Sequence, residues 1–94
     1  DNIREKNDNF SIPSVIPNPL TNSATIEFKL DKPGMVKLTV VNSNGIEVAE
    51  LEDTYLEAGP HSRVFGAEAM PSGVYYYKLQ VDDQVNCGKM IVIK

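Results

Sequence analysis

Apolar and polar residues alternate with a period of two along much of this chain, and this pattern is the strongest constraint on its fold. Residues 24–30 read Ala-Thr-Ile-Glu-Phe-Lys-Leu, and residues 36–40 read Val-Lys-Leu-Thr-Val. Successive side chains of a β-strand point to opposite faces, so each stretch predicts a strand with one face in a core and one in water. The β-branched residues of the second stretch support this interpretation.

Turn signals divide the rest of the chain into further short segments. Asn44-Gly45 tolerates the positive φ angles of a tight hairpin and predicts that the chain returns as a strand from Ile46. A helix across residues 46–56 is the weaker alternative, because no cap and no sustained 3.6-residue apolar stripe supports it. Three prolines in residues 12–20 restrict that stretch to an extended lead-in at a sheet edge. About seven strands separated by turns predict an all-β sandwich.

Two segments near the end of the chain are rich in apolar residues. Alternation places Tyr75 and Tyr77 on one face of a strand and Tyr76 on the other, so one of these faces serves the core. Residues 90–93 form an unbroken apolar run, typical of a strand that is covered on both faces or needs a partner. Lysines flank this run at positions 89 and 94. They either discourage edge pairing or belong to an address that another protein reads through strand addition.

The composition limits the classes of function. A chain of 94 residues with a net charge of −4 supports one domain and offers no basic surface for nucleic acid or anionic lipid. It has no apolar run long enough for membrane insertion. The polar residues 1–11 predict a linker or upstream processing region, followed by one domain over residues 12–94. The chain starts at Asp1 without an initiator methionine, so we expect it to be part of a longer protein.

Few residues are suited to catalysis or metal binding. His61 and Cys87 are the only residues of their types, which excludes an intramolecular disulfide and a Cys/His zinc cluster. We expect Cys87 to be a small buried hydrophobe and His61 to be a polar residue near a turn. The acidic residues at 50–57 and 82–83 lack the spacing of a calcium loop and are expected to be solvated. We therefore predict no catalytic, cofactor or metal site.

Four blocks of sequence carry a resemblance to a known family. They are Ile16–Leu20 with Ala24–Phe28, Val40–Val48, Met70–Leu79 and Gly88–Lys94. Together, and over nearly the whole chain from about Val15 to Lys94, they resemble the type A C-terminal sorting domain of the type IX (Por) secretion system. The family's motif and turn residues fall on Pro17, Asn18, Pro19, Gly45, Pro71, Ser72, Gly73, Val74 and Tyr75. The sorting-signal motif falls on Gly88, Lys89, Met90, Ile91, Val92, Ile93 and Lys94.

This resemblance implies both a fold and a function. The fold is an immunoglobulin-like β-sandwich of about seven antiparallel strands at the end of a cargo protein secreted by a Bacteroidetes-type bacterium. The function is a non-enzymatic secretion signal, which carries an N-terminal cargo domain of the same precursor from the periplasm across the outer membrane. The implied partners are the outer-membrane translocon, a shuttle protein and a sortase-like protease, which commonly removes the domain and attaches the cargo to the cell surface.

Two departures from the family pattern and three alternatives remain. Leu20 stands where an aromatic residue is frequent, and Lys89 is a single lysine where two often occur. The immunoglobulin-like domain of flagellar hook-capping proteins shares the Pro-Asn-Pro and Pro-Ser-Gly-Val-Tyr patterns. A carbohydrate-binding module would depend on Tyr76, a thin platform without tryptophan. The third alternative is a passive spacer, and dimerisation through the terminal strand is a further expectation.

Overall fold

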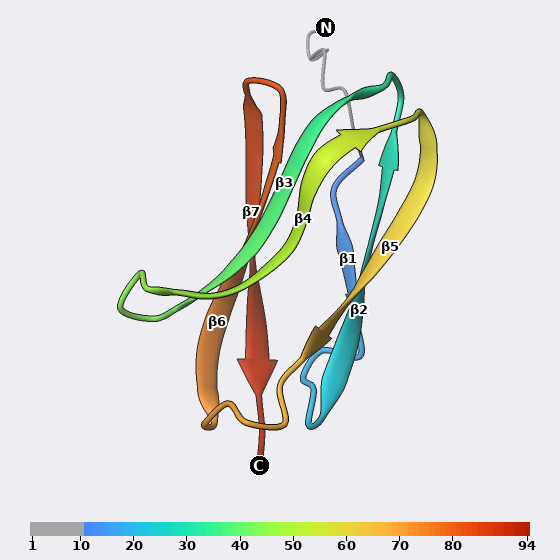
Figure 1. Ribbon diagram of the computed structural model, residues 1–94. Coiled ribbons are helices and arrows are strands. Elements are labelled where there is room, and N and C mark those ends of the chain that lie inside the picture. Colours follow the sequence, from blue (N-terminus) through green and yellow to red (C-terminus); the bar gives the residue numbers. More distant parts are fainter. Residues whose placement is uncertain (1–10) are drawn as a thin grey trace, which may run out of the picture.

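The computed structural model describes residues 11–94, so all but the last residue of the predicted processing region lies outside the described residues. The described part of the chain forms strands and contains no helix (Figure 1). The strands are β1 (Ser14–Ile16), β2 (Ser23–Leu30), β3 (Gly34–Asn42), β4 (Glu47–Leu56), β5 (Gly59–Gly66), β6 (Gly73–Val81) and β7 (Gln84–Val92). The all-β prediction is confirmed, and the stretch with a helical alternative is strand β4.

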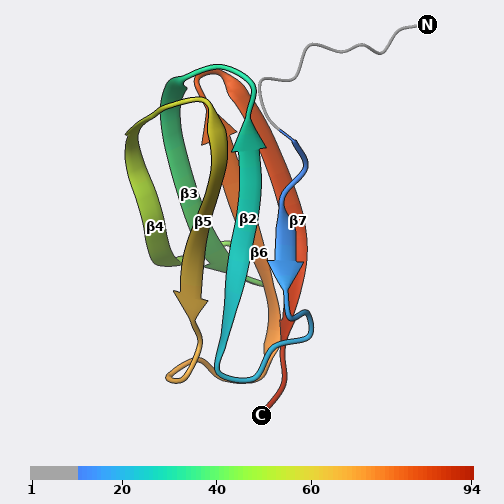
Figure 2. The same cartoon turned by 90° about the vertical axis from the view of Figure 1, so that its right-hand side faces the viewer.

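The strands form two sheets that stack face to face. The three-stranded sheet has the order β1-β2-β5, and the four-stranded sheet has the order β4-β3-β6-β7. All neighbouring strands within each sheet are antiparallel. Figure 2 shows the three-stranded sheet in front of the four-stranded one. This arrangement is the expected immunoglobulin-like sandwich.

The core lies between the sheets and is built by the inward-facing residues of each strand. Its largest fully buried side chains are Phe65, Leu20, Ile26, Leu30, Leu38, Leu79, Met90, Val36, Val40, Val81 and Val92. Tyr75 and Tyr77 are also buried, whereas Tyr76 is 40% exposed, so the predicted alternation of the tyrosines is confirmed. Because the period-two pattern gives each strand one apolar face, the two sheets can bury those faces only against each other.

The β3–β4 hairpin follows the turn chemistry expected at its asparagine and glycine. Gly45 has a φ of 81°, and its amide donates to the carbonyl oxygen of Asn42 at 2.9 Å. The side chain of Asn42 adds a cap, since its Oδ1 accepts from the amides of Asn44 and Ile46 at 2.9 and 3.0 Å. Short amide side chains commonly close turns in this way.

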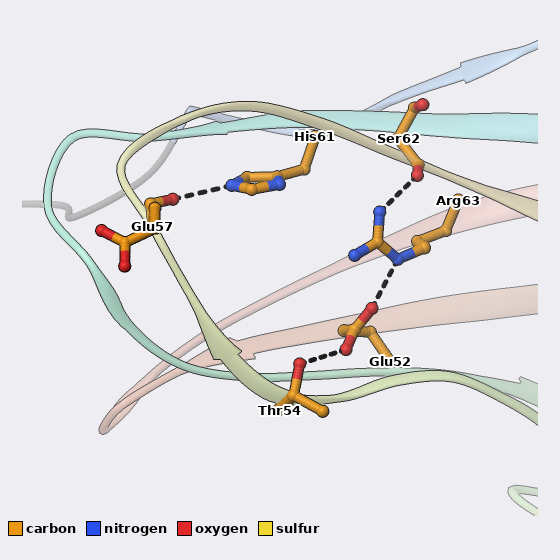
Figure 3. A network of polar contacts seen from close by, with 6 residues as sticks. All are labelled: Glu52, Thr54, Glu57, His61, Ser62 and Arg63. Carbon is orange, nitrogen blue, oxygen red and sulfur yellow. Dashed lines mark hydrogen bonds and ion pairs between the residues drawn. The ribbon is translucent and has the colours of Figure 1, made fainter.

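An ion pair joins the two sheets where β4 and β5 follow one another (Figure 3). Nε of Arg63 on β5 donates to Oε1 of Glu52 on β4 at 2.5 Å. The hydroxyl of Thr54 donates to the other oxygen of the same carboxylate, and Nη1 of Arg63 donates to the carbonyl oxygen of Ser62 at 2.6 Å. The hydrogen bond from Thr54, followed by the contact with the Arg63 guanidinium, holds the pKa of Glu52 below its ordinary value.

His61 lies at the start of β5, beside the turn from β4. Its Nε2 is 2.7 Å from the carbonyl oxygen of Glu57 (Figure 3). Its ring stacks on Phe28 with 5.6 Å between ring centroids. The ring therefore has one polar partner and one apolar partner. This agrees with the expectation of a structural polar residue near a turn.

The expected burial of Cys87 is wrong. Its side chain is exposed, because the odd-numbered residues of β7 face water and the even-numbered residues face the core. Gly88 takes the inward position opposite Tyr77 of β6. A Cβ atom added at Gly88 would overlap the Tyr77 ring, which fills the space of the missing side chain. The large ring thus requires glycine at this position, and the strand period places Cys87 in water.

Substituting Gly88 tests this packing. Gly88→Ala should lower the free energy of unfolding by about 1–3 kcal/mol, because the new methyl group forces the Tyr77 ring or the strand to move. Urea unfolding followed by tyrosine fluorescence measures the change. Gly66→Ala is the control and should not destabilise the domain by more than about 0.5 kcal/mol, since a Cβ there meets no heavy atom within 4 Å. Equal losses in the two variants would contradict the packing argument.

Acid pH tests the ion pair between the sheets. A lowered pKa means that ionised Glu52 stabilises the fold above the unfolded-state pKa of about 4.3, and this stabilisation is lost as pH falls through the folded-state pKa. Glu52→Gln should therefore cost about 1–2 kcal/mol at pH 7 and progressively less below about pH 4. Urea unfolding at a series of pH values checks this. The control is Glu27→Gln, which changes an exposed carboxylate on β2. A deficit independent of pH would show that the charge of Glu52 is not its cause.

Candidate functional site

Strand β7 contains most of the predicted sorting-signal motif and forms one edge of the four-stranded sheet. Met90 and Val92 are buried in the core, Ile91 is half-buried, and Lys89 and Ile93 are exposed. The apolar run is therefore covered on its inner face and partly open to water on its outer face. The structure therefore does not cover this run on both faces, and whether the strand needs a partner stays a prediction.

The segment that contains Pro17, Asn18 and Pro19 lies along the outer edge of β7. Oδ1 of Asn18 accepts from the amide of Ile91 at 3.1 Å, and its Nδ2 donates to the carbonyl oxygen of Lys89 at 3.0 Å. One side-chain amide thus replaces a strand partner by supplying both an acceptor and a donor. The peptide bonds Ile16-Pro17 and Asn18-Pro19 are cis.

Leu20 continues this coverage with its backbone. Its amide donates to the carbonyl oxygen of Ile91, and its own carbonyl oxygen accepts from the amide of Ile93, both at 2.9 Å. Its side chain is fully buried. Residues 14–20 therefore begin in the three-stranded sheet as β1 and end against the edge of the four-stranded sheet. The departure from the family pattern at Leu20 leaves an aliphatic side chain in the core.

The loop between β5 and β6 holds the end of the chain beyond β7. The amide of Lys94 donates to Oγ of Ser72 at 3.0 Å, and its Nζ donates to the carbonyl oxygens of Ala67 and Glu68 at 2.7 and 3.2 Å. Nothing in the sequence signals this use of main-chain oxygens. The Lys94 ammonium is engaged in the fold, whereas Lys89 forms no ion pair with any residue from 11 to 94.

Tyr75 fastens the same loop from the other side. Its hydroxyl donates to the carbonyl oxygen of Pro71 at 2.8 Å, four residues earlier, and its ring packs 6.3 Å from the Phe65 ring. A tyrosine near the start of a strand that bonds back to the preceding loop is a recurrent corner in immunoglobulin-like sandwiches. Gly73 and Val74 begin β6 directly after this loop, and Val74 pairs with Ile91.

Three of the predicted motif blocks therefore meet at one end of β7. The parts that meet are residues 17–20 of the first block, residues 71–75 of the third block and residues 88–94, and the bonds described above connect the first two parts to the last. Gly45 does not join them, since its hydrogen bond lies within the β3–β4 hairpin. Sequence reasoning identified these blocks separately, but hydrogen bonds between distant residues bring them together, and no local pattern reveals such bonds.

Charges on the outer face of the four-stranded sheet are separated by sign. The outward residues of β6 and β7 include Lys78 and Lys89 and no acidic residue. Strand β4 carries Glu47, Glu50 and Asp53 at the opposite edge, where the hydrogen bond with Asp53 raises the pKa of Glu50. Within residues 11–94, no group of three His, Cys, Asp or Glu residues is placed to hold a metal ion. The region around β7 is thus apolar and basic, although the whole chain is acidic.

Other surfaces offer less organised chemistry. A depression of about 470 Å³ is lined by residues 11, 12, 14, 27–29 and 60–62. Its only imidazole is that of His61, which already contacts Glu57. The exposed tyrosines, Tyr76 and Tyr55, lie at opposite ends of β3, roughly 20 Å apart at the rise of an extended strand, and form no continuous platform. None of the described elements is a helix long and apolar enough to cross a membrane.

The fold and the site define a β-sandwich module whose characteristic residues organise its last strand. A family model for the secretion system C-terminal sorting domain matches residues 14–94, and the chain belongs to this family. No curated protein compared with the chain matches it. Membership identifies a type IX C-terminal sorting signal, which is part of a cargo precursor that is secreted or displayed at the cell surface and interacts with the secretion machinery. The family is not a family of enzymes.

Asn18 provides a test of how the edge of β7 is held. Asn18→Ala removes a donor and an acceptor and should lower the free energy of unfolding by about 1–2 kcal/mol. Asn18→Asp keeps the acceptor for the Ile91 amide but places a carboxylate oxygen where Nδ2 donated to the carbonyl oxygen of Lys89, so repulsion should make its loss at pH 7 at least as large as that of Asn18→Ala. Thermal and urea unfolding measure both variants at pH 7. A loss for Asn18→Asp that is clearly smaller than that for Asn18→Ala would contradict this assignment.

Proposed function

We propose that the sorting machinery reads this domain as a folded surface centred on the outer face of β7. The observation that carries the proposal is the meeting of residues 17–20, 71–75 and 88–94 at the end of that strand. Met90 and Val92 are buried, and Lys94 is bonded to the β5–β6 loop. A protein that binds the folded domain can therefore contact the side chains of Lys89, Ile91 and Ile93. The signal therefore consists of alternate side chains of the motif, arranged by the motif's other members.

We also propose a route for the domain, in line with the family resemblance described above. The domain accompanies its cargo through the periplasm, meets a shuttle protein and the outer-membrane translocon, and is then removed by a sortase-like protease, after which the cargo is attached to the cell surface. We place the cut in or near residues 1–11, because these polar residues precede the first strand. The domain itself supplies the signal and has no part in the chemistry of cleavage.

Exposed residues test the proposal without removing the core. Deleting residues 88–94 would also delete buried Met90 and Val92, so loss of secretion would not separate signal from fold. In a reporter fused upstream of the domain, Lys89→Ala combined with Ile93→Ser should reduce secretion by a type IX host about tenfold, as expected for a loss of about 1.4 kcal/mol in recognition. The measurement is the fraction of reporter in the medium and at the cell surface.

The control changes a lysine and an exposed β-branched apolar residue on the other sheet. Lys29→Ala combined with Val64→Ser replaces an exposed lysine and an exposed apolar residue on β2 and β5. We expect secretion close to that of the unchanged domain. Thermal unfolding confirms that both double variants fold. If the β7 variant folds and is secreted as well as this control, the proposed surface is wrong.

A further inference from the structure

The outer edge of β7 is covered by the chain itself over only part of its length. Asn18 forms hydrogen bonds with the amide of Ile91 and the carbonyl oxygen of Lys89. Leu20 forms hydrogen bonds with the carbonyl oxygen of Ile91 and the amide of Ile93. These are backbone groups that point away from β6. The same outward orientation recurs at every second residue of a strand, and so it applies to Val85 and Cys87. Among residues 11–94, no backbone group outside β6 bonds to these two residues.

The other sheet edges carry features that prevent further pairing. Strand β4 has two irregularities in its register with β3, at Leu38/Thr39 and Val40/Val41, and an outer face rich in carboxylates. Strand β5 contains Pro60, and β1 is only three residues long. Residues 85–88 of β7 contain no proline, no charge and no irregularity in the pairing with β6. Bulges, prolines, charges and short strands are the usual protection of an edge; residues 85–88 have none of them, and Lys89 is the one charge that borders them.

We propose that residues 85–89 of β7 are a docking edge, to which a component of the type IX machinery adds a short β-strand that carries a carboxylate. This inference rests on the proposed function and names its mode of recognition. The stretch spans roughly 17 Å, the length of a five-residue strand. It offers the amides and carbonyl oxygens of Val85 and Cys87 and the amide of Lys89.

Side chains along this edge indicate the chemistry of the added strand. Val85 is 49% exposed and favours an apolar neighbour, and exposed Lys89 has no ion pair with a described residue. No acidic residue lies on the outer faces of β6 and β7, so nothing there repels a carboxylate beside Lys89. Cross-strand pairs of opposite charge stabilise a sheet, which makes an acidic residue the matching partner. Asn18 ends the open stretch and fixes how far the added strand can reach.

Proline at position 87 tests the edge through the backbone. The amide of Cys87 points away from β6, so Cys87→Pro removes the donor needed by an added strand without breaking a bond of the existing sheet. Cys87→Val is the matched control, because it changes the side chain and keeps the amide. In the full precursor in its secreting cell, we expect Cys87→Pro to reduce secretion at least about tenfold and Cys87→Val to stay within about twofold of wild type.

Several results would overturn the docking edge while leaving the proposed function intact. One is normal secretion of a folded Cys87→Pro variant, and another is an equal loss in Cys87→Val, which would place recognition in the side chain. A wild-type domain that is dimeric in solution and becomes monomeric with Cys87→Pro would assign the edge to a second copy of the chain. Failure of the wild-type domain to direct secretion would instead refute the proposed function.

A second pair of variants decides the matter if Cys87→Pro does not fold. Lys89→Glu places a negative charge at the open edge, whereas Lys78→Glu places the same charge one strand further in, on β6. Repulsion of the incoming carboxylate should reduce secretion at least about tenfold for Lys89→Glu and less than about threefold for Lys78→Glu. Equal effects of the two substitutions would overturn the proposal, because only Lys89 borders the added strand.

Discussion

Hydrogen bonding between residues 18–20 and the edge of β7 is the interaction on which the end of this sandwich depends. It ties the chain that leaves the three-stranded sheet to the last strand of the four-stranded sheet. Leu20 adds a fully buried side chain at that junction. The same bonds cover one half of the β7 edge and leave the other half open. Fold closure and the proposed recognition surface thus share one strand, and the position of Asn18 separates the two roles.

Some motif residues of the family hold β7 and its neighbouring loop in place, and others are exposed at the proposed recognition surface. Gly88 accommodates the Tyr77 ring, Tyr75 fastens the loop through Pro71, and Ser72 accepts the amide of Lys94. These residues are engaged inside the domain, so on the proposed function they contribute to sorting only indirectly. On the proposed function, much of the motif serves to hold β7 in place with a defined outer face.

The sequence predicts the structure correctly where local periodicity and turn chemistry decide it. Alternation predicted strands and correctly separated Tyr76 from its two neighbours, because the two faces of a strand are fixed by position alone. The expectation for Cys87 is wrong. Apolar neighbours in the sequence do not show which face of a strand is buried, because the neighbouring position that faces the core is a glycine. In the sequence, Lys89 and Lys94 have equivalent places on either side of the apolar run. In the structure, only the ammonium of Lys94 donates to carbonyl oxygens.

The sequence by itself determined the all-β class, the approximate strands and the family, because these depend on residue type and spacing along the chain. Tertiary structure decided which strand is an edge, which motif blocks touch, and which backbone groups remain available to a partner. The physical reason is that edge and contact are properties of residues far apart in the sequence. Asn18 meets Ile91 across 73 positions, and no local pattern of charge or hydropathy encodes that meeting.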